Sequence, residues 1–397
     1  MTASPRLRVL EIAYTRHVWG AELATMALAE PLASRGIDLA LGAPPGGELE
    51  DRWRARGLPF IPLAFADRQG VRDAGGSGRP GPAQFAGELV TTARSVRLIA
   101  SAARGFDMIH SNSLWSHLDC ALAGRLARRP TVLELYDLVR PGLGRRLLTA
   151  AAALSTTAVA ISTAVADCIG PLGARHVTIL PLSVDLERFG PGPVPAAVRR
   201  TLTSDPDAPL VGIVGRIDPE KGVDVLVRAV SLLEGPAART HLVVVGSGAL
   251  APEGYPEAVR AEAGRLLGDR VRFVGRTDDV PATMRALDVL VNASVAEPFG
   301  LSVLEAQASG VAVVGTRAGG IPDFVSDGDN GLLVPSGDAT ALAAALTRLV
   351  TDDALRHGIG ARAAASARAL GTEERAVAVA ELYRRATGRG AGVAASV

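Results

Sequence analysis

The sequence has 397 residues, 48% hydrophobic and 4% aromatic, which is typical of globular proteins and long enough for two α/β domains. A net charge of +1 argues against a general nucleic-acid binder. Cys120 and Cys168 fit neither a metal-ligand spacing nor a disulfide framework. The first 190 residues hold 21 basic and 17 acidic residues, an excess of four. This excess leaves two interpretations open, a solvated face or an anionic or membrane-surface partner. Because an apolar strand starts almost at once, without a signal-peptide core, we expect a cytoplasmic protein, with the inner face of the membrane as the alternative.

In the first half, short β-branched and apolar runs alternate with helical stretches at 22–35 and 86–103, a pattern typical of parallel sheets built from βαβ units. The predicted strands are 8–13, 37–42, 59–63, 107–111, 131–135, 157–161 and 177–181. Residues 67–84 are rich in Gly, Pro and Arg and predict a mobile loop, either a lid over an acceptor or an inert insertion.

A Pro- and Asp-rich linker at 190–208 precedes a second βαβ series. Its predicted strands are 210–214, 241–245, 271–274, 288–292, 311–314 and 331–334, and a last helix follows at about 372–388. The domains expected are 1–190, joined by the C-terminal helix at about 372–397, and 207–371. Doubly wound α/β domains bind ligands at the carboxyl ends of their strands, which predicts two such domains facing a central cleft.

Lys221 is a single lysine among 42 basic residues, and it lies in Gly-Arg-Ile-Asp-Pro-Glu-Lys-Gly (215–222), directly after an apolar strand. The planar guanidinium of Arg216 suits bidentate contact with phosphate, and the ammonium of Lys221 is a compact point charge. Together they could neutralise a diphosphate without a metal, so we predict no metal site. The plainer alternative is a helix start with an incidental lysine.

A second motif, Glu-Pro-Phe-Gly-Leu-Ser-Val-Leu-Glu, spans residues 297–305. It predicts Glu297 in a loop after a buried strand, and Glu305 about one turn into a helix that starts near Leu301. Free N–H groups around Gly300 and Leu301 can receive an anion, aided by the helix dipole. The alternative is a pair of solvated glutamates beside a tight turn.

The Gly-Arg…Lys-Gly run, followed by Glu-x7-Glu, resembles glycosyltransferase family 4, and the resemblance covers nearly the whole chain. Residues 155–189, 316–322 and 331–335 also match the pattern of that family. The resemblance implies the GT-B fold, a C-terminal helix that crosses back to the first domain, and a retaining transfer of sugar from a nucleoside-diphosphate donor. The donor is a substrate, so no cofactor is expected.

The resemblance also implies roles for particular residues. Arg216, Lys221 and Glu297 would act in catalysis. Residues binding the donor would be Gly20, Arg216, Lys221, Arg276, Glu297, Phe299, Gly300, Leu301 and Glu305. Of these, Arg216 and Lys221 would hold the diphosphate, Glu297 the sugar hydroxyls and Glu305 the ribose. Gly20 would let the backbone approach the diphosphate.

The first domain departs from the family pattern in two places. Asn112 replaces a second His in Asp-x-x-His-x-His, after His110, and Tyr136 replaces the His of Thr-x-His-Asp. We assign His110, Asn112 and Tyr136 to the acceptor side. His117 is a further candidate, although a lone helical His is more often packed or solvated.

The sequence therefore predicts a metal-independent sugar transferase acting on a glycan, a lipid-linked or a small-molecule acceptor. Two alternatives are open: a catalytically silent subunit with the same fold, and a nucleotide-sugar epimerase. The Gly246-Ser-Gly248 stretch matches a dinucleotide fingerprint only loosely, because Pro252 and Gly254 follow where a packed helix is required.

Overall fold

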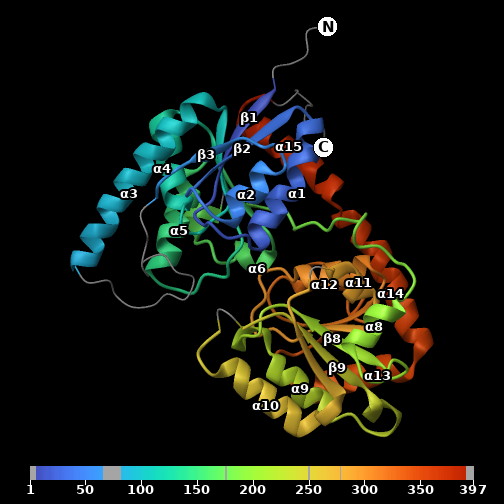
Figure 1. The fold of residues 1–397 in the computed structure, drawn as a ribbon. Helices are drawn as coiled ribbons and strands as arrows, with labels where there is room; N and C mark the ends of the chain where they lie inside the picture. Colours follow the sequence, from blue (N-terminus) through green and yellow to red (C-terminus); the bar gives the residue numbers. More distant parts are fainter. Residues whose placement is uncertain (1–5, 66–81, 175–176, 249–250, 278, 390–397) are drawn as a thin grey trace. The chain divides into compact units, whose positions relative to one another are not determined.

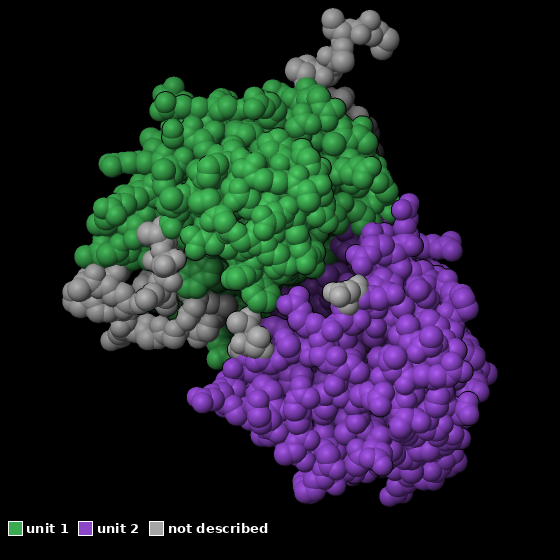
Figure 2. Space-filling model, viewed as in Figure 1, with its two compact units in different colours: residues 1–182, 372–397 green, residues 183–371 purple. Residues whose placement is uncertain are grey.

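The computed structural model describes residues 6–65, 82–174, 177–248, 251–277 and 279–389. These residues form two compact units. Unit 1 comprises residues 1–182 and 372–397, and unit 2 comprises residues 183–371 (Figure 2). The helix at the C-terminal end thus belongs to unit 1, as the sequence predicted.

Unit 1 is built on a seven-stranded parallel sheet in the order β3-β2-β1-β4-β5-β6-β7 (Figure 1). Its strands are β1 (Leu7–Ile12), β2 (Ile37–Ala43), β3 (Phe60–Pro62), β4 (Met108–Ser111), β5 (Thr131–Leu135), β6 (Thr157–Ala160) and β7 (Val177–Ile179). Its helices are α1 (Gly20–Ser34), α2 (Glu48–Arg54), α3 (Pro82–Ala102), η1 (Ala103–Gly105), α4 (His117–Ala127), α5 (Leu143–Leu154), α6 (Thr163–Ala166), α7 (Pro171–Ala174) and α15 (Thr372–Ala386).

The faces of this sheet follow from the alternation of side chains along each strand. Leu7, Val9, Met108 and Val132 pack with residues of α1 and α15 in one buried cluster. Helix α4 packs against β4 and β5, and α3 and α5 lie against α4. The C-terminal helix is therefore part of the hydrophobic core of unit 1.

Unit 2 contains a six-stranded parallel sheet in the order β10-β9-β8-β11-β12-β13. Its strands are β8 (Leu210–Val214), β9 (His241–Val245), β10 (Val271–Gly275), β11 (Val289–Asn292), β12 (Ala312–Thr316) and β13 (Leu332–Val334). Its helices are α8 (Ala196–Leu202), η2 (Pro219–Lys221), α9 (Val223–Ser231), η3 (Gly235–Arg239), α10 (Tyr255–Leu267), η4 (Gly268–Arg270), α11 (Val280–Arg285), α12 (Leu301–Ala308), η5 (Ile321–Asp323), α13 (Ala339–Thr351), α14 (Asp353–Ala367) and η6 (Arg368–Leu370).

Every predicted strand is present, with ends no more than two residues from those predicted. The strand order reverses once in each sheet, between β1 and β4 in unit 1 and between β8 and β11 in unit 2. Both units are thus doubly wound, as predicted, and each has a switch point where ligands bind in such folds. The mobile loop predicted at 67–84 falls mostly outside the described residues, and its last three residues, 82–84, belong to the start of α3.

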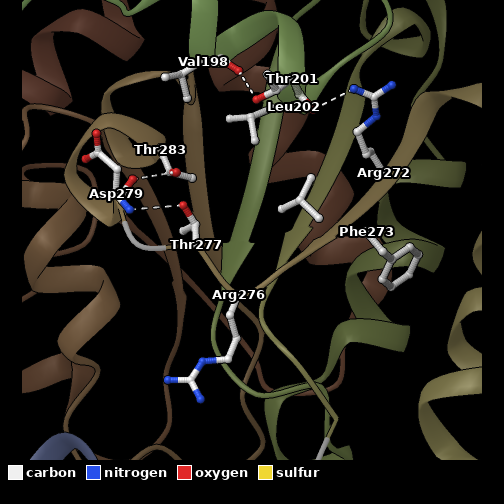
Figure 3. A pocket seen from close by; sticks show the side chains of 10 residues that line it. Val198, Thr201, Leu202, Arg272, Phe273, Arg276, Thr277, Asp279 and Thr283 are labelled. Atoms are coloured by element: carbon white, nitrogen blue, oxygen red, sulfur yellow. Dashed lines mark hydrogen bonds between the residues drawn. The ribbon is translucent and has the colours of Figure 1, made fainter.

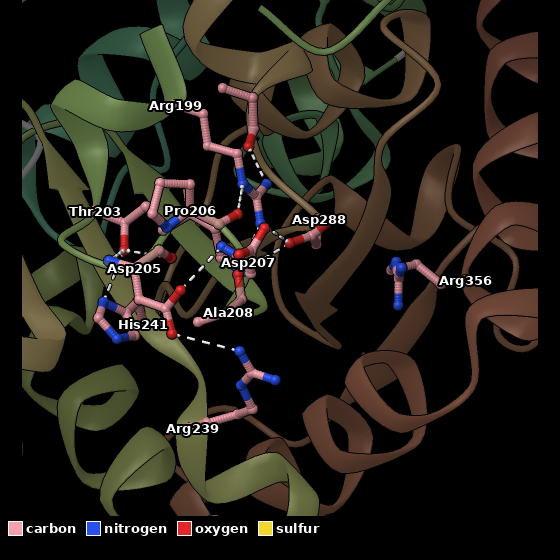
Figure 4. Close-up of polar contacts among 12 residues, drawn as sticks. Arg199, Thr203, Asp205, Pro206, Asp207, Ala208, Arg239, His241, Asp288 and Arg356 are labelled. Carbon is pink, nitrogen blue, oxygen red and sulfur yellow. Dashed lines mark hydrogen bonds and ion pairs between the residues drawn. The ribbon is translucent and has the colours of Figure 1, made fainter. Parts of the chain in front are cut away.

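The predicted linker at 190–208 is wrong in one respect, because it contains helix α8. Arg199 holds this helix, donating to the carbonyls of Ala286 and Ala208 at 2.7 and 2.8 Å and to Asp288 at 2.7 Å (Figure 4). Thr203 Oγ1 lies 2.7 Å from His241 Nδ1. Contacts with residues distant in the sequence thus stabilise a helix in a segment whose Pro and Asp content predicted a linker. Residues 183–190, placed with the first domain by the sequence, cluster with unit 2.

We predict that Gly124→Ala lowers the free energy of unfolding by about 1–3 kcal/mol. A Cβ at this buried position of α4 would lie 1.9 Å from Thr131 Oγ1 and 2.8 Å from the Arg129 carbonyl, so α4 would have to move away from β5. Gly264→Ala is the matched control, since that helical position in α10 has no atom within 4 Å of an added Cβ. The control should gain up to about 1 kcal/mol. Urea denaturation followed by circular dichroism measures both, and equal effects would contradict the packing argument.

Candidate functional site

The switch point of unit 2 brings two loops together at the carboxyl edge of its sheet. One loop (215–222) follows β8 and the other (293–300) follows β11, which pairs with β8. The N–H of Val295 donates to the Glu220 carbonyl at 2.8 Å. Gly222 has φ +63°, and a Cβ there would lie 2.2 Å from the Ala293 carbonyl oxygen. Only glycine permits so close an approach of the two backbones.

The sequence places Lys221 at the end of a short capped turn. Asp218 begins this turn, and its carboxylate accepts a hydrogen bond from the N–H of Lys221 at 3.2 Å. Arg216 precedes the turn with an exposed side chain, and its Nη1 lies 3.1 Å from Asp218 Oδ2. Asp218 was not among the predicted site residues, although an Asp before Pro is a familiar start signal for a helical turn.

Glu297 and Lys221 form an ion pair, with Nζ 2.7 Å from Oε2. The same Oε2 accepts from Asn292 Nδ2 and Ser294 Oγ, each at 3.0 Å. Burial favours the neutral acid, but Lys221, Asn292 and Ser294 together lower the pKa of the Glu297 carboxyl below its usual range. Within the described part of the chain, no hydrogen bond is recorded for Oε1. The site thus holds an ionised carboxylate with one fixed oxygen and one available for a ligand.

Sequence reasoning missed Asn292 and Ser294, which orient this carboxylate. Both lie within five residues of Glu297, at the end of β11 and in the loop that follows. A polar residue ending an otherwise apolar strand, as in Leu-Val-Asn, was the available signal. Without the fold, nothing distinguished it from an ordinary turn residue.

The loop after Glu297 is held by aromatic packing and by glycine. Phe299 is buried and stacks on Phe324, with ring centroids 4.9 Å apart. Gly300 has φ +103° and begins α12, so the first turn of that helix presents its N–H groups at the same edge of the sheet. Gly320 donates to the Glu297 carbonyl at 2.8 Å, which joins the loop after β12 to the site.

Glu305 lies in α12, half-buried and one turn from the helix start, as predicted. Burial raises the pKa of its carboxyl to about 7, and the positive charge of Arg188 opposes that shift. The carboxyl therefore titrates near neutral pH. Arg188 was not predicted from the sequence, because it lies more than a hundred residues earlier in the chain.

Arg276 follows β10 and lines a pocket of about 550 Å³ with residues of α8, β10 and α11 (Figure 3). Its exposed guanidinium is directed away from Val198 and Thr201. No recorded contact joins Arg276 to Lys221 or Glu297 in the described parts of the chain. Its role in binding the donor stays a prediction.

Gly20 is the first residue of α1. The Glu22 carboxylate accepts from the N–H of Trp19 at 3.1 Å, which fixes the helix start. A Cβ at Gly20 would meet no atom within 4 Å, so a backbone-approach role remains sterically open.

The three predicted acceptor-side residues lie near the carboxyl ends of β4 and β5 in unit 1. His110 is buried, with Nδ1 2.6 Å from Glu11 Oε2 and 2.8 Å from the Tyr383 hydroxyl of α15. Although burial opposes the charge, Glu11 and Glu134 raise the pKa of His110. Glu134 in turn pairs with the buried Arg375 of α15. His110 thus belongs to a buried network that attaches α15 to the sheet.

Asn112 comes two residues after His110, just beyond the end of β4. Tyr136 comes two residues after Glu134, just beyond the end of β5. Asn112 is buried, and its Oδ1 has no hydrogen-bond partner among the described residues. Burial raises the pKa of Tyr136 well above its ordinary value. His117, the further candidate, is buried with Nδ1 2.9 Å from Ser111 Oγ, a packed arrangement.

Two family models match this chain: "Glycosyltransferase Family 4" over residues 18–188 and "Glycosyl transferases group 1" over residues 208–352. The two matches together cover most of both units. The chain belongs to glycosyltransferase family 4.

Curated relatives named D-inositol 3-phosphate glycosyltransferase match part of this family 4 chain. The Streptomyces bingchenggensis protein is 38% identical over 217 residues, which cover 53% of the chain and 48% of the relative. The Kineococcus radiotolerans protein is 40% identical over 229 residues, covering 53% and 52%. The chain spans about half the length of the curated relatives it matches.

Two solved structures share the fold over nearly the whole chain. Anabaena Alr3699/HepE in complex with UDP has a TM-score of 0.80 at 23% identity, covering 96% of this chain and 100% of that one. Sucrose-phosphate synthase from Thermosynechococcus elongatus has a TM-score of 0.75 at 23% identity, covering 96% and 99%. The fold is GT-B, with two Rossmann-like domains, as predicted.

The described residues lack two kinds of feature. They contain no group of three or more His, Cys, Asp or Glu side chains that could hold a metal ion. They also contain no helix with the length and hydrophobicity needed to cross a membrane.

We predict that Lys221→Met lowers the free energy of unfolding of unit 2 by about 3 kcal/mol, because it leaves the buried Glu297 carboxylate without its cation. Lys221→Met combined with Glu297→Gln should recover much of that loss, since the double variant buries no charge at the pair. A double-mutant cycle measured by urea unfolding gives the coupling energy. Additive losses would contradict the pairing.

We predict that wild-type stability falls by about 3 kcal/mol as pH rises from 4.5, the ordinary pKa of Glu, to about 7, the pKa of folded Glu305. In this range the folded state holds a proton that the unfolded state has released, so raising the pH favours unfolding. Glu305→Gln should lack this component, and the exposed Glu257→Gln should retain it. Urea titrations at a series of pH values measure the three proteins, and a pH-independent difference between wild type and Glu305→Gln would refute the assignment.

Proposed function

We propose that the chain is a retaining glycosyltransferase that moves a sugar from a nucleoside-diphosphate donor to an acceptor without a metal ion. The observation that carries this proposal is the fixed Glu297 carboxylate paired with Lys221 at the switch point of unit 2, with Arg216 on the same loop as Lys221. The names of the curated relatives support the class of reaction. The Anabaena structures, which contain UDP and UDP-glucose, support a nucleotide-sugar donor.

In the proposed mechanism, negative charge grows on the diphosphate as the bond to the sugar breaks. The Lys221 ammonium carries three donors, of which Glu297 takes one, so two can bind phosphate oxygens. Arg216 and the N–H groups at the start of α12 add to the same electrostatic stabilisation. These cations lower the barrier because they bind the departing diphosphate in the transition state more tightly than they bind the intact donor in the ground state.

Glu297 would hold the donor sugar rather than attack it. Its Oε2 is occupied by three donors, whereas Oε1 can accept hydroxyl groups of the sugar. Glu305, whose pKa lies near 7, would accept hydrogen bonds from the ribose in its ionised form. Residues of unit 1, including Asn112 with its unpaired Oδ1, would contact the acceptor.

We predict that one of UDP, GDP, ADP or dTDP raises the melting temperature of the wild-type protein, and that EDTA leaves this rise unchanged. UDP is the first to test. Lys221→Ala should abolish the rise, while Arg348→Ala, an exposed change on α13, should keep it. A rise that requires a divalent cation would contradict the metal-independent mechanism.

Turnover then separates the proposal from its alternatives. Mixing the matching nucleotide-sugar with inositol 3-phosphate and other candidate acceptors should give a product whose anomeric configuration, read by NMR, equals that of the donor. Inversion would exclude retention. An epimerised sugar formed without acceptor would indicate an epimerase, and nucleotide binding without hydrolysis or transfer would favour the silent subunit.

A further inference from the structure

Helix α3 of unit 1 has an exposed face that combines aliphatic and cationic side chains. Leu89, Val90 and Leu98 are 57%, 52% and 40% exposed. Arg94 and Arg97 are exposed between them. At 100° per residue, these five positions occupy one half of the helix circumference. We call them the α3 face.

The opposite side of α3 is packed, which fixes the orientation of the helix. Ser95 and Ile99 are buried there, and α3 lies against α4. In Figure 1 the helix forms an outer flank of unit 1. The α3 face is therefore presented outward by the core, and its exposure does not depend on a frayed or isolated helix.

The arginines of the α3 face have no ion-pair partner in the described portion of the chain. The one acidic residue between positions 86 and 104, Glu88, lies outside the half of the circumference that holds the α3 face. Beyond the helix, Arg104 is exposed, and at the end of the adjacent α4 Leu126 is 62% exposed with Arg125 and Arg128 beside it. The same mixture of side chains thus continues across two neighbouring helices.

We propose that the α3 face docks unit 1 onto an anionic membrane surface. A basic amphipathic helix binds in the interface plane, where aliphatic side chains enter the headgroup region and cations meet anionic lipid. Single exposed aliphatic residues need no explanation, but three on one helix face with two unpaired cations give that face a basic amphipathic character.

Other occupants fit the α3 face less well. In a symmetric dimer through this face, Arg94 and Arg97 would meet the same cations of the second copy. Nucleic acid would neutralise the arginines but would leave Leu89, Val90 and Leu98 without a matching surface, and the net charge of the chain is only +1. A lipid surface satisfies both kinds of side chain, and the proposal does not depend on transferase activity.

Co-sedimentation of the full chain with phosphatidylcholine vesicles, with and without phosphatidylglycerol, tests the proposal. Wild type should bind only the anionic vesicles and should dissociate at high NaCl. Arg94→Gln/Arg97→Gln should weaken binding about 25-fold, from about fivefold for each arginine near an anionic surface. Leu89→Ser/Val90→Ser should weaken it about tenfold while retaining the dependence on salt.

Matched exposed changes in unit 2 serve as controls. Arg200→Gln/Arg348→Gln and Val194→Ser/Leu232→Ser remove the same side-chain types and should bind as wild type does. Thermal unfolding by circular dichroism verifies that all variants are folded.

Three outcomes would overturn the proposal. The first is a wild type that does not sediment with anionic vesicles at low salt, or α3-face variants that bind as tightly as the controls. The second is a dimer in sedimentation equilibrium that Leu89→Ser/Val90→Ser dissociates, which would assign the face to a second copy. The third is duplex DNA binding of wild type, lost in Arg94→Gln/Arg97→Gln, without vesicle binding.

Discussion

The candidate site depends on the adjacency of two strands that lie far apart in the sequence. β8 and β11 are neighbours in the sheet of unit 2 because the strand order reverses between them. Their following loops then approach so closely that Gly222 has no room for a Cβ against Ala293. This contact brings Lys221 to Glu297, and the ion pair in turn needs Asn292 and Ser294 to hold the carboxylate. If β8 and β11 were not neighbours, Lys221 would lie apart from Glu297, Asn292 and Ser294.

The same arrangement explains how a buried carboxylate can remain charged. Glu297 is 7% exposed, and burial alone would favour the neutral acid. One cation and two neutral donors converge on a single oxygen, so the charge is stabilised while the second oxygen keeps its capacity to accept. Glu305, eight residues later, lacks such donors, and burial dominates there. Two glutamates of one motif therefore acquire opposite pKa shifts from their surroundings.

Much of this fold was predictable from the sequence, because its strands are continuous runs of β-branched and aliphatic residues, such as Leu-Val-Val-Val in β9. The two motifs that contain Lys221 and Glu297 could also be recognised from the sequence as parts of a candidate site. Helix α8 was not, since Arg199 stabilises it through contacts nearly ninety residues away. Nor was the attachment of His110 to Tyr383, separated by 273 residues, because pattern and composition carry no information about such pairs.

The scarcity of lysine has a practical consequence for chemistry on this protein. Apart from the α-amino group, Lys221 is the only primary amine in the chain. Its side chain is 22% exposed, and its Nζ is paired with the Glu297 carboxylate. Reagents that acylate amines would therefore address Lys221 and the α-amino group, and would leave the arginine side chains unmodified. A spectroscopic label introduced in this way would report from beside Glu297 without any cysteine having to be engineered.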